Sequence, residues 1–135
     1  MTAPPRTFVA LAALALLEGV GLIAYATFSI VEAIRVGASG PEEVSNLPAI
    51  AVLILIQALF GLGMLWVARG WWQQRRWARA PFVLTQLIAL LVGYELAQSA
   101  GLVERVSGIG LGLVAIVGLV LSFLPVVTRS IEPAA

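Results

Sequence analysis

Four long apolar stretches constrain the fold of this chain more than any other feature. They cover residues 8–31, 47–68, 80–100 and 106–127. Each is close to the roughly 20 residues that a helix needs to cross about 30 Å of hydrocarbon. Because backbone polar groups inside a bilayer must be satisfied within the segment, each stretch is expected to be helical. The sequence therefore predicts an all-α fold, a four-helix transmembrane bundle that forms one membrane domain over residues 1–135.

The scarcity of polar residues excludes most catalytic chemistry. Hydrophobic residues make up 61% of the chain and charged residues only 11%, compared with about 25% charged residues in soluble proteins. Histidine and cysteine are absent, which excludes imidazole and thiolate chemistry and the usual zinc sites. The net charge of +1 gives no reason to expect a nucleic-acid partner. We therefore predict a non-enzymatic membrane protein without a cofactor or a metal.

Glycine and proline mark the expected ends of the helices. A glycine after the last turn suits a left-handed C-terminal cap. Pro125 lies in the last turns of the fourth stretch, where its missing N–H predicts that the helix kinks or ends. The glycines expected to cap the first three helices are Gly37, Gly40, Gly70 and Gly101.

The arginines are distributed unevenly over the predicted loops. Four of them lie in the link formed by residues 69–79, and an even number of spans places Arg6 and Arg129 on the same side. Only Arg35 and Arg105 remain for the other side. The positive-inside rule then predicts that both termini and the 69–79 link lie in the cytoplasm, in a multi-pass protein of the plasma membrane.

The 69–79 link also carries tryptophans. Amphipathic rings prefer the membrane–water interface, and arginines at that depth can meet anionic lipid phosphates. Topological anchoring is one interpretation of this link, and a docking patch for a cytoplasmic or membrane partner is the other. The predicted lipid-interface residues are Trp66, Trp71, Trp72, Trp77, Arg69, Arg75, Arg76 and Arg79.

The first stretch could also be read as a secretory signal. Arg6, the apolar run over residues 8–17 and the small residues Ala24 and Ala26 are typical of a cleaved leader. The apolar pattern continues past these alanines as far as Val31, which favours a membrane span. The orientation predicted for the other three helices is the same in both cases.

Two polar residues are expected at the same depth in the first two helices. At about 1.5 Å per residue, Glu18 lies about 15 Å from Phe8 and Gln57 about 16 Å from Ala68. We therefore predict a hydrogen bond between Glu18 and Gln57. Because a charge near the bilayer centre costs at least a few kcal/mol, Glu18 is a functional candidate.

Further polar residues extend this candidate intramembrane site. Glu18, Tyr25 and Glu32 recur every seven residues and share a stripe of the first helix. Glu95 shares a face of the third helix with Gln98 and Ser99, opposite Gln86. Our hypothesis is that the stripe faces Glu95 and Gln57 inside the bundle. These carboxyls could be protonated donors that hold helices together, could handle protons or cations, or could contact a separate partner helix. The site residues are Glu18, Gln57, Tyr25 and Glu95.

The fourth stretch has no ionisable side chain but many small ones. Small residues four positions apart allow two helix backbones to approach closely. Packing within the chain's own bundle and contact with a dimer or partner remain as alternatives. The predicted helix-packing residues are Gly108, Gly112, Ala115 and Ser122.

Two resemblances bear on function. The block Arg75-Arg-Trp-Ala-Arg-Ala-Pro-Phe-Val-Leu-Thr-Gln-Leu87 resembles the uncharacterised four-span integral membrane proteins of high-GC Gram-positive bacteria, which implies topology but no activity. Leu17-Glu18-Gly19 and the glycine-rich fourth span are similar to the small multidrug resistance exporters, whose first span carries a proton- and substrate-binding Glu. Members of that family are shorter, and their dual-topology forms have a weaker charge bias.

Two functions of different classes follow. The first is an accessory or assembly subunit of a membrane complex, in contact with lipid and with other copies or other membrane subunits. The alternative is a proton-coupled small-molecule exporter that acts as a dimer through Glu18, since four helices pack into a solid bundle without a path of their own.

Overall fold

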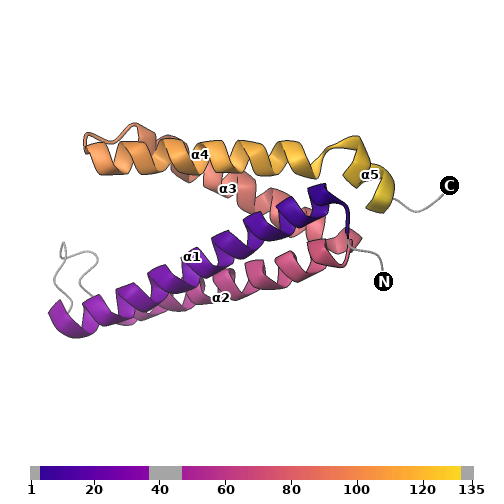
Figure 1. Ribbon diagram of the computed structural model, residues 1–135. Coiled ribbons are helices and arrows are strands. Elements are labelled where there is room, and N and C mark those ends of the chain that lie inside the picture. The colour runs from indigo at the N-terminus through magenta and orange to yellow at the C-terminus, as the bar shows by residue number, and fades with distance from the viewer. Residues whose placement is uncertain (1–3, 37–46, 132–135) are drawn as a thin grey trace. The chain divides into compact units, whose positions relative to one another are not determined.

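The computed structural model describes residues 4–36 and 47–131, and within these ranges it contains helices and no strand. The all-α prediction is thereby confirmed. Four helical segments, counting η1 with α3, are long and apolar enough to cross a membrane. The elements labelled in Figure 1 are α1 (Arg6–Val36), α2 (Leu47–Trp72), α3 (Arg79–Ala97), α4 (Leu102–Ser122) and α5 (Pro125–Ile131). The short 3-10 helix η1 (Arg76–Ala78) lies directly before α3.

The helices do not end where the apolar stretches end. Both α1 and α2 continue beyond the predicted 8–31 and 47–68, because helical hydrogen bonding between backbone groups does not require apolar side chains. In contrast, α4 stops at Ser122, before the predicted end at residue 127. Hydropathy marks the depth of the membrane, whereas local backbone chemistry determines the helix end.

Pro125 accounts for the early end of α4. The N–H groups of Phe123 and Leu124 bond to carbonyls three residues back, each at 3.3 Å, so the last turn is tightened. Pro125 has no N–H to continue the ladder and instead begins α5, where a missing donor is harmless. The predicted kink or end at this proline is confirmed.

The contacts divide the chain into two units, residues 1–14 with 67–135 and residues 15–66. An aromatic cluster forms part of the core of the first unit. The ring of Trp71 lies 6.0 Å from that of Phe8 and 5.6 Å, edge to face, from that of Phe82. All three side chains are fully buried. The cluster therefore joins the start of α1, the end of α2 and the start of α3.

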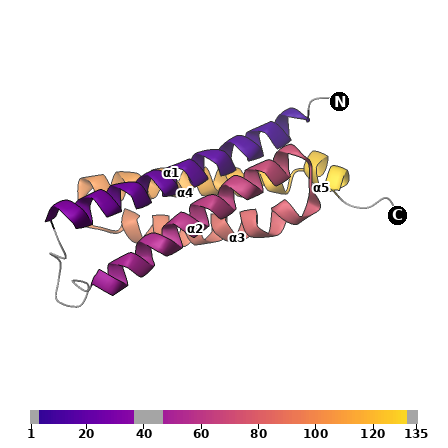
Figure 2. The ribbon, with the colours of Figure 1, turned by 90° about the horizontal axis from the view of Figure 1, so that it is seen from below.

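The first unit also contains a close contact between α3 and α4, which run side by side (Figure 2). A Cβ added at Gly108 would come 2.5 Å from the Ala97 nitrogen and 2.6 Å from the Gly93 carbonyl oxygen. A Cβ at Gly93 would come 2.8 Å from the Gly108 carbonyl oxygen and 3.0 Å from the Gly112 nitrogen. The two backbones therefore touch, which only glycine at Gly93 and Gly108 allows.

The second unit pairs α1 with α2 through two other glycines. A Cβ added at Gly19 would come 2.9 Å from both the Gly61 carbonyl oxygen and the Leu65 Cδ2. A Cβ at Gly61 would come 2.7 Å from the Ile23 Cγ1. This contact therefore combines backbone with flexible side chains, and it fixes the antiparallel register of the two helices.

The link after α2 is closed by a left-handed residue that is not glycine. Gln74 has φ 56°. Its N–H bonds to Trp71 at 3.0 Å, and the Arg75 N–H bonds to the Gly70 carbonyl at 2.8 Å. This pattern is a Schellman cap with Gln at the position that glycine usually occupies.

Two glycines predicted to cap helices have other roles. Gly70 lies inside α2, where a Cβ would come 2.8 Å from the Ala78 Cβ and from the Trp77 ring. Gly101 has φ −74° and is the N-cap of α4, with the Glu104 carboxylate folded over it. The left-handed caps predicted at both positions are wrong. Gly37 and Gly40 lie outside the described residues.

Candidate functional site

The predicted interface residues fall into two groups. Trp66, Trp72 and Trp77 are 66%, 54% and 45% exposed, as lipid- or interface-facing rings should be. Trp71 is fully buried in the aromatic cluster, so its assignment to the lipid interface is wrong. The reason lies in the helix: Trp71 continues the buried face of Met64 and Ala68, whereas its neighbour Trp72 does not.

The arginines of the 69–79 link also differ from one another in burial. Arg69, Arg75 and Arg76 are exposed, but Arg79 is half-buried at the start of α3. Its Nη2 donates to the Thr128 hydroxyl on α5 at 3.1 Å. A role in surface anchoring alone, as predicted for Arg79, is therefore wrong, because this side chain ties α3 to α5.

The Arg79 guanidinium also lies on an aromatic face. Its Cζ is 4.6 Å from the centroid of the Phe123 ring at the end of α4, a cation–π distance. Its Nε is buried without a hydrogen-bond partner. Within residues 4–36 and 47–131 the contacts of this cation are a hydroxyl and a ring, and no carboxylate pairs with it.

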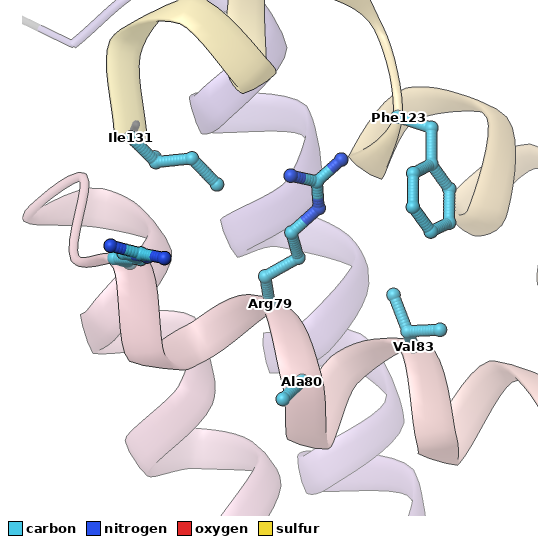
Figure 3. A pocket seen from close by; sticks show the side chains of 6 residues that line it. Arg79, Ala80, Val83, Phe123 and Ile131 are labelled. Atoms are coloured by element: carbon cyan, nitrogen blue, oxygen red, sulfur yellow. The ribbon is translucent and has the colours of Figure 1, made fainter. Parts of the chain in front are cut away.

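Arg79 lines an open cavity of about 490 Å³ (Figure 3). Figure 3 shows the Arg79 side chain rising from α3 between Ile131 and Phe123, with Val83 below the ring. The cavity thus combines two guanidinium groups with apolar walls. Its lining residues are Arg76, Arg79, Ala80, Val83, Phe123 and Ile131.

Glu18 is half-buried in α1, and Gln57 is half-buried in α2 with its Oε1 buried and unbonded. The register of the second unit sets Gly61 against Ile23. Because the helices are antiparallel, Gln57, one turn before Gly61 in α2, lies opposite the turn after Ile23 in α1. That position is about 12 Å along the helix axis from Glu18. The predicted hydrogen bond between Glu18 and Gln57 is therefore wrong, because equal depths counted from the helix ends do not give the register in which α1 and α2 pack.

The packed face of α3 is the reverse of the one expected. Glu95 and Gln86 do lie on opposite faces, but Gln86 is fully buried and Glu95 is exposed. The Gln86 amide packs on Gly118 of α4, where an added Cβ would come 3.1 Å from its Cδ. The prediction that Glu95 faces the interior is wrong within the first unit, and Tyr25 in the second unit is 57% exposed.

The small residues of α4 lie on its packed face. Gly108, Ala115 and Ser122 are buried, and the Gly112 backbone meets Gly93. The Ser122 hydroxyl donates to the Leu119 carbonyl at 2.8 Å, so it is satisfied inside its own helix. Of the two alternatives, packing within the chain is the one observed for this stripe.

In the described part of the chain, no group of three or more His, Cys, Asp or Glu is placed to hold a metal ion. Comparisons with protein families, with curated proteins and with solved structures give no match for this chain. The resemblances drawn from the sequence therefore stay predictions.

Two residues that position Arg79 were not predicted from the sequence. Thr128 and Phe123 hold Arg79, yet Thr128 is 49 positions away in the chain. The break at Pro125 is the one signal that could have found them, because a new helix, α5, begins there directly after the end of α4. Gln86 had a clearer signal, since it is seven residues before Gly93 and so shares its face.

Proposed function

We propose that this multi-pass membrane protein is a non-enzymatic accessory or assembly subunit of a membrane complex. The observation that carries the proposal is the face of α1 that α2 leaves uncovered. Leu17, Tyr25 and Phe28 on this face are 65%, 57% and 61% exposed. A Cβ added at Gly21, between them, would meet nothing within 4 Å.

This face has the chemistry of a helix-docking surface. In lipid, helices associate by close packing at small residues and by hydrogen bonds from polar side chains rather than by the hydrophobic effect. Gly21 has no side chain and so leaves a notch in this surface, where the backbone of another helix can approach. The Tyr25 hydroxyl, one turn later, provides a hydrogen-bond donor near it. Gly19, Ile23 and Ala26, on the opposite face of α1, are already used or buried in the second unit. The Gly21 face is thus available for a helix of another subunit.

Extraction in a mild detergent followed by native mass spectrometry tests this proposal. We expect the wild-type chain to be recovered with a different membrane protein. The variant Gly21→Leu should lose that partner, because the side chain fills the notch without touching α2. Gly63→Leu on α2, where the added side chain also meets open space, is the matched control and should keep the partner.

Recovery of the wild type as a monomer or a homodimer alone would contradict the subunit proposal. Equal loss of the partner in both glycine variants would also contradict it, because the effect would then not be specific to the Gly21 face.

Glu18 supports a second candidate, a proton-coupled small-molecule exporter that works as a dimer. The supporting observation is a half-buried carboxyl in the middle part of a membrane-spanning helix. Glu18→Gln should abolish proton-driven efflux from vesicles if this candidate is correct, whereas Glu95→Gln, at an exposed position, should not. Efflux that survives Glu18→Gln would exclude the mechanism.

We further propose that the protein lies in the plasma membrane with both termini in the cytoplasm. The support is the arginine distribution and the exposure of Trp72 and Trp77 beside the arginine-rich link. A green fluorescent protein fused to either terminus should fluoresce, and alkaline phosphatase fused to either terminus should be inactive. The opposite pair of results would contradict the proposal and show that both termini lie outside the cytoplasm.

A further inference from the structure

The arginine-lined cavity between α3, α4 and α5 has features that a surface-anchoring role does not explain. All six of its lining residues belong to the first unit. Two of them are cationic and the other four are apolar. A cavity that served only packing would not be lined by two guanidinium groups.

The arginine at the centre of this cavity is held in place but is not neutralised. The Phe123 ring and the Thr128 hydroxyl fix the plane of the Arg79 guanidinium, and its Nε remains buried without a partner. Arg76, one turn earlier, lies on the same cavity with an exposed side chain. Two guanidinium groups with donors to spare match the oxygens of a phosphate, which arginine binds with paired hydrogen bonds.

The apolar walls of the cavity indicate that the part of the ligand beyond its anionic group is apolar. Ala80 and Val83 line the cavity along α3 in the direction of the membrane span, and Phe123 is 57% exposed at the end of α4. Trp77, close in sequence to both arginines, is 45% exposed, which suits a ring at the membrane surface. A ligand with an anionic head at the surface and an apolar tail along the helices fits both parts.

We propose that this cavity is a binding site for the phosphate headgroup of an anionic phospholipid. Arg79 and Arg76 bind the phosphate oxygens, and the first part of an acyl chain lies against Val83 and Phe123. The site stands apart from the proposed subunit function, because the Gly21 face lies in the other unit.

Titration of the full-length protein in detergent micelles with dioctanoyl phosphatidylglycerol, followed by native mass spectrometry, tests the proposal. We expect saturable binding of one lipid. Arg79→Gln should weaken it by at least about tenfold, and Arg76→Gln by about threefold. Arg75→Gln removes the same charge from an exposed arginine outside the cavity and should change binding by less than about twofold.

Two further experiments distinguish a lipid-binding site from a site for free phosphate. Val83→Trp fills the apolar wall and should weaken lipid binding while both arginines remain. Inorganic phosphate at the same concentration should not displace the lipid. If Arg79→Gln does not fold, because its contact with Thr128 is lost, Arg76→Gln and Val83→Trp still decide the result.

Three results would overturn the proposal. The first is an equal loss of binding in Arg75→Gln and Arg76→Gln, which would mean bulk surface charge. The second is displacement of the lipid by inorganic phosphate, which would mean a free-phosphate site. The third is the lack of saturable lipid binding by the wild type.

Discussion

The two helix pairs of this protein are both joined at glycines, but backbone atoms form a larger share of the closest contacts in one pair than in the other. Gly108 of α4 lies against the backbone of Gly93 and Ala97. Gly61 of α2 lies chiefly against the Ile23 side chain, with the Gly19 carbonyl oxygen beside it. Backbone cannot move aside for a new methyl group, whereas a side chain can change rotamer. The α3–α4 pair should therefore tolerate substitution less well than the α1–α2 pair.

The first unit has a second source of stability in its aromatic cluster. Phe8, Trp71 and Phe82 bring together three elements that are far apart in the sequence. The α1–α2 pair of the second unit depends on the contact between Gly19 and Gly61. Variants in each unit can therefore show how unequally the stability is distributed.

Removal of the aromatic core should have the largest effect. Trp71→Ala leaves a cavity between Phe8 and Phe82 and should lower the free energy of unfolding by about 3–5 kcal/mol. Trp72→Ala, at the neighbouring exposed position, should lower it by less than about 1 kcal/mol. Reversible unfolding in mixed micelles measures both values. Equal losses would contradict the distinction between a core and an interface tryptophan.

The backbone contact between α3 and α4 should give the next largest effect. Gly108→Ala should lower the free energy of unfolding by about 2–3 kcal/mol, since the new methyl group meets backbone atoms on the partner helix. Gly110→Ala, where the methyl group meets open space, should leave stability within about 0.5 kcal/mol. The same unfolding measurement compares them, and similar values would show that the two backbones do not touch.

The contact between α1 and α2 should be more tolerant. Gly61→Ala should lower the free energy of unfolding by about 1 kcal/mol, because the Ile23 side chain can shift. Gly63→Ala is the control and should have almost no effect. A loss from Gly61→Ala as large as that from Gly108→Ala would remove the proposed difference between the two pairs.

The smallest effect should be a gain in stability, from a substitution in the link between α2 and α3. Gln74 holds a left-handed conformation with φ 56°, which is unfavourable for a residue with a Cβ. Gln74→Gly should raise the free energy of unfolding by about 0.5–1 kcal/mol. Gln73→Gly, where φ is not positive, should give no gain. A loss of stability in Gln74→Gly would contradict the Schellman cap.

The membrane-spanning helices could be predicted because their cause is local. About 20 apolar residues in a row suffice, and Pro125 marks an end by its own chemistry. Gly108 and Ala115 could also be assigned to a packed face, because their spacing follows one helix. Trp71 could not be distinguished from Trp72 by depth alone, since its burial depends on Phe8 and Phe82.

The polar residues were the least predictable. Gln86 was expected on the outer face because it lies opposite Glu95, yet its amide packs against Gly118 of α4. The hydrogen bond between Arg79 and Thr128 joins positions 49 residues apart, and it depends on how the chain turns at Pro125. Glu18 and Gln57 were paired by counted depth, and the actual register separates them. The register between helices that are distant in the sequence could not be predicted from the sequence pattern.

Labelling of single cysteines from each side of the membrane decides whether α3 crosses the bilayer with the arginine-rich link in the cytoplasm, as we propose. The chain has no cysteine of its own, so Gln73→Cys and Gln98→Cys, at exposed positions beyond the two ends of the helix, report without background. A membrane-impermeant maleimide added to intact cells should label Gln98→Cys and leave Gln73→Cys unlabelled until the cells are opened. Labelling of both positions from one side, or the reverse pattern, would contradict the account.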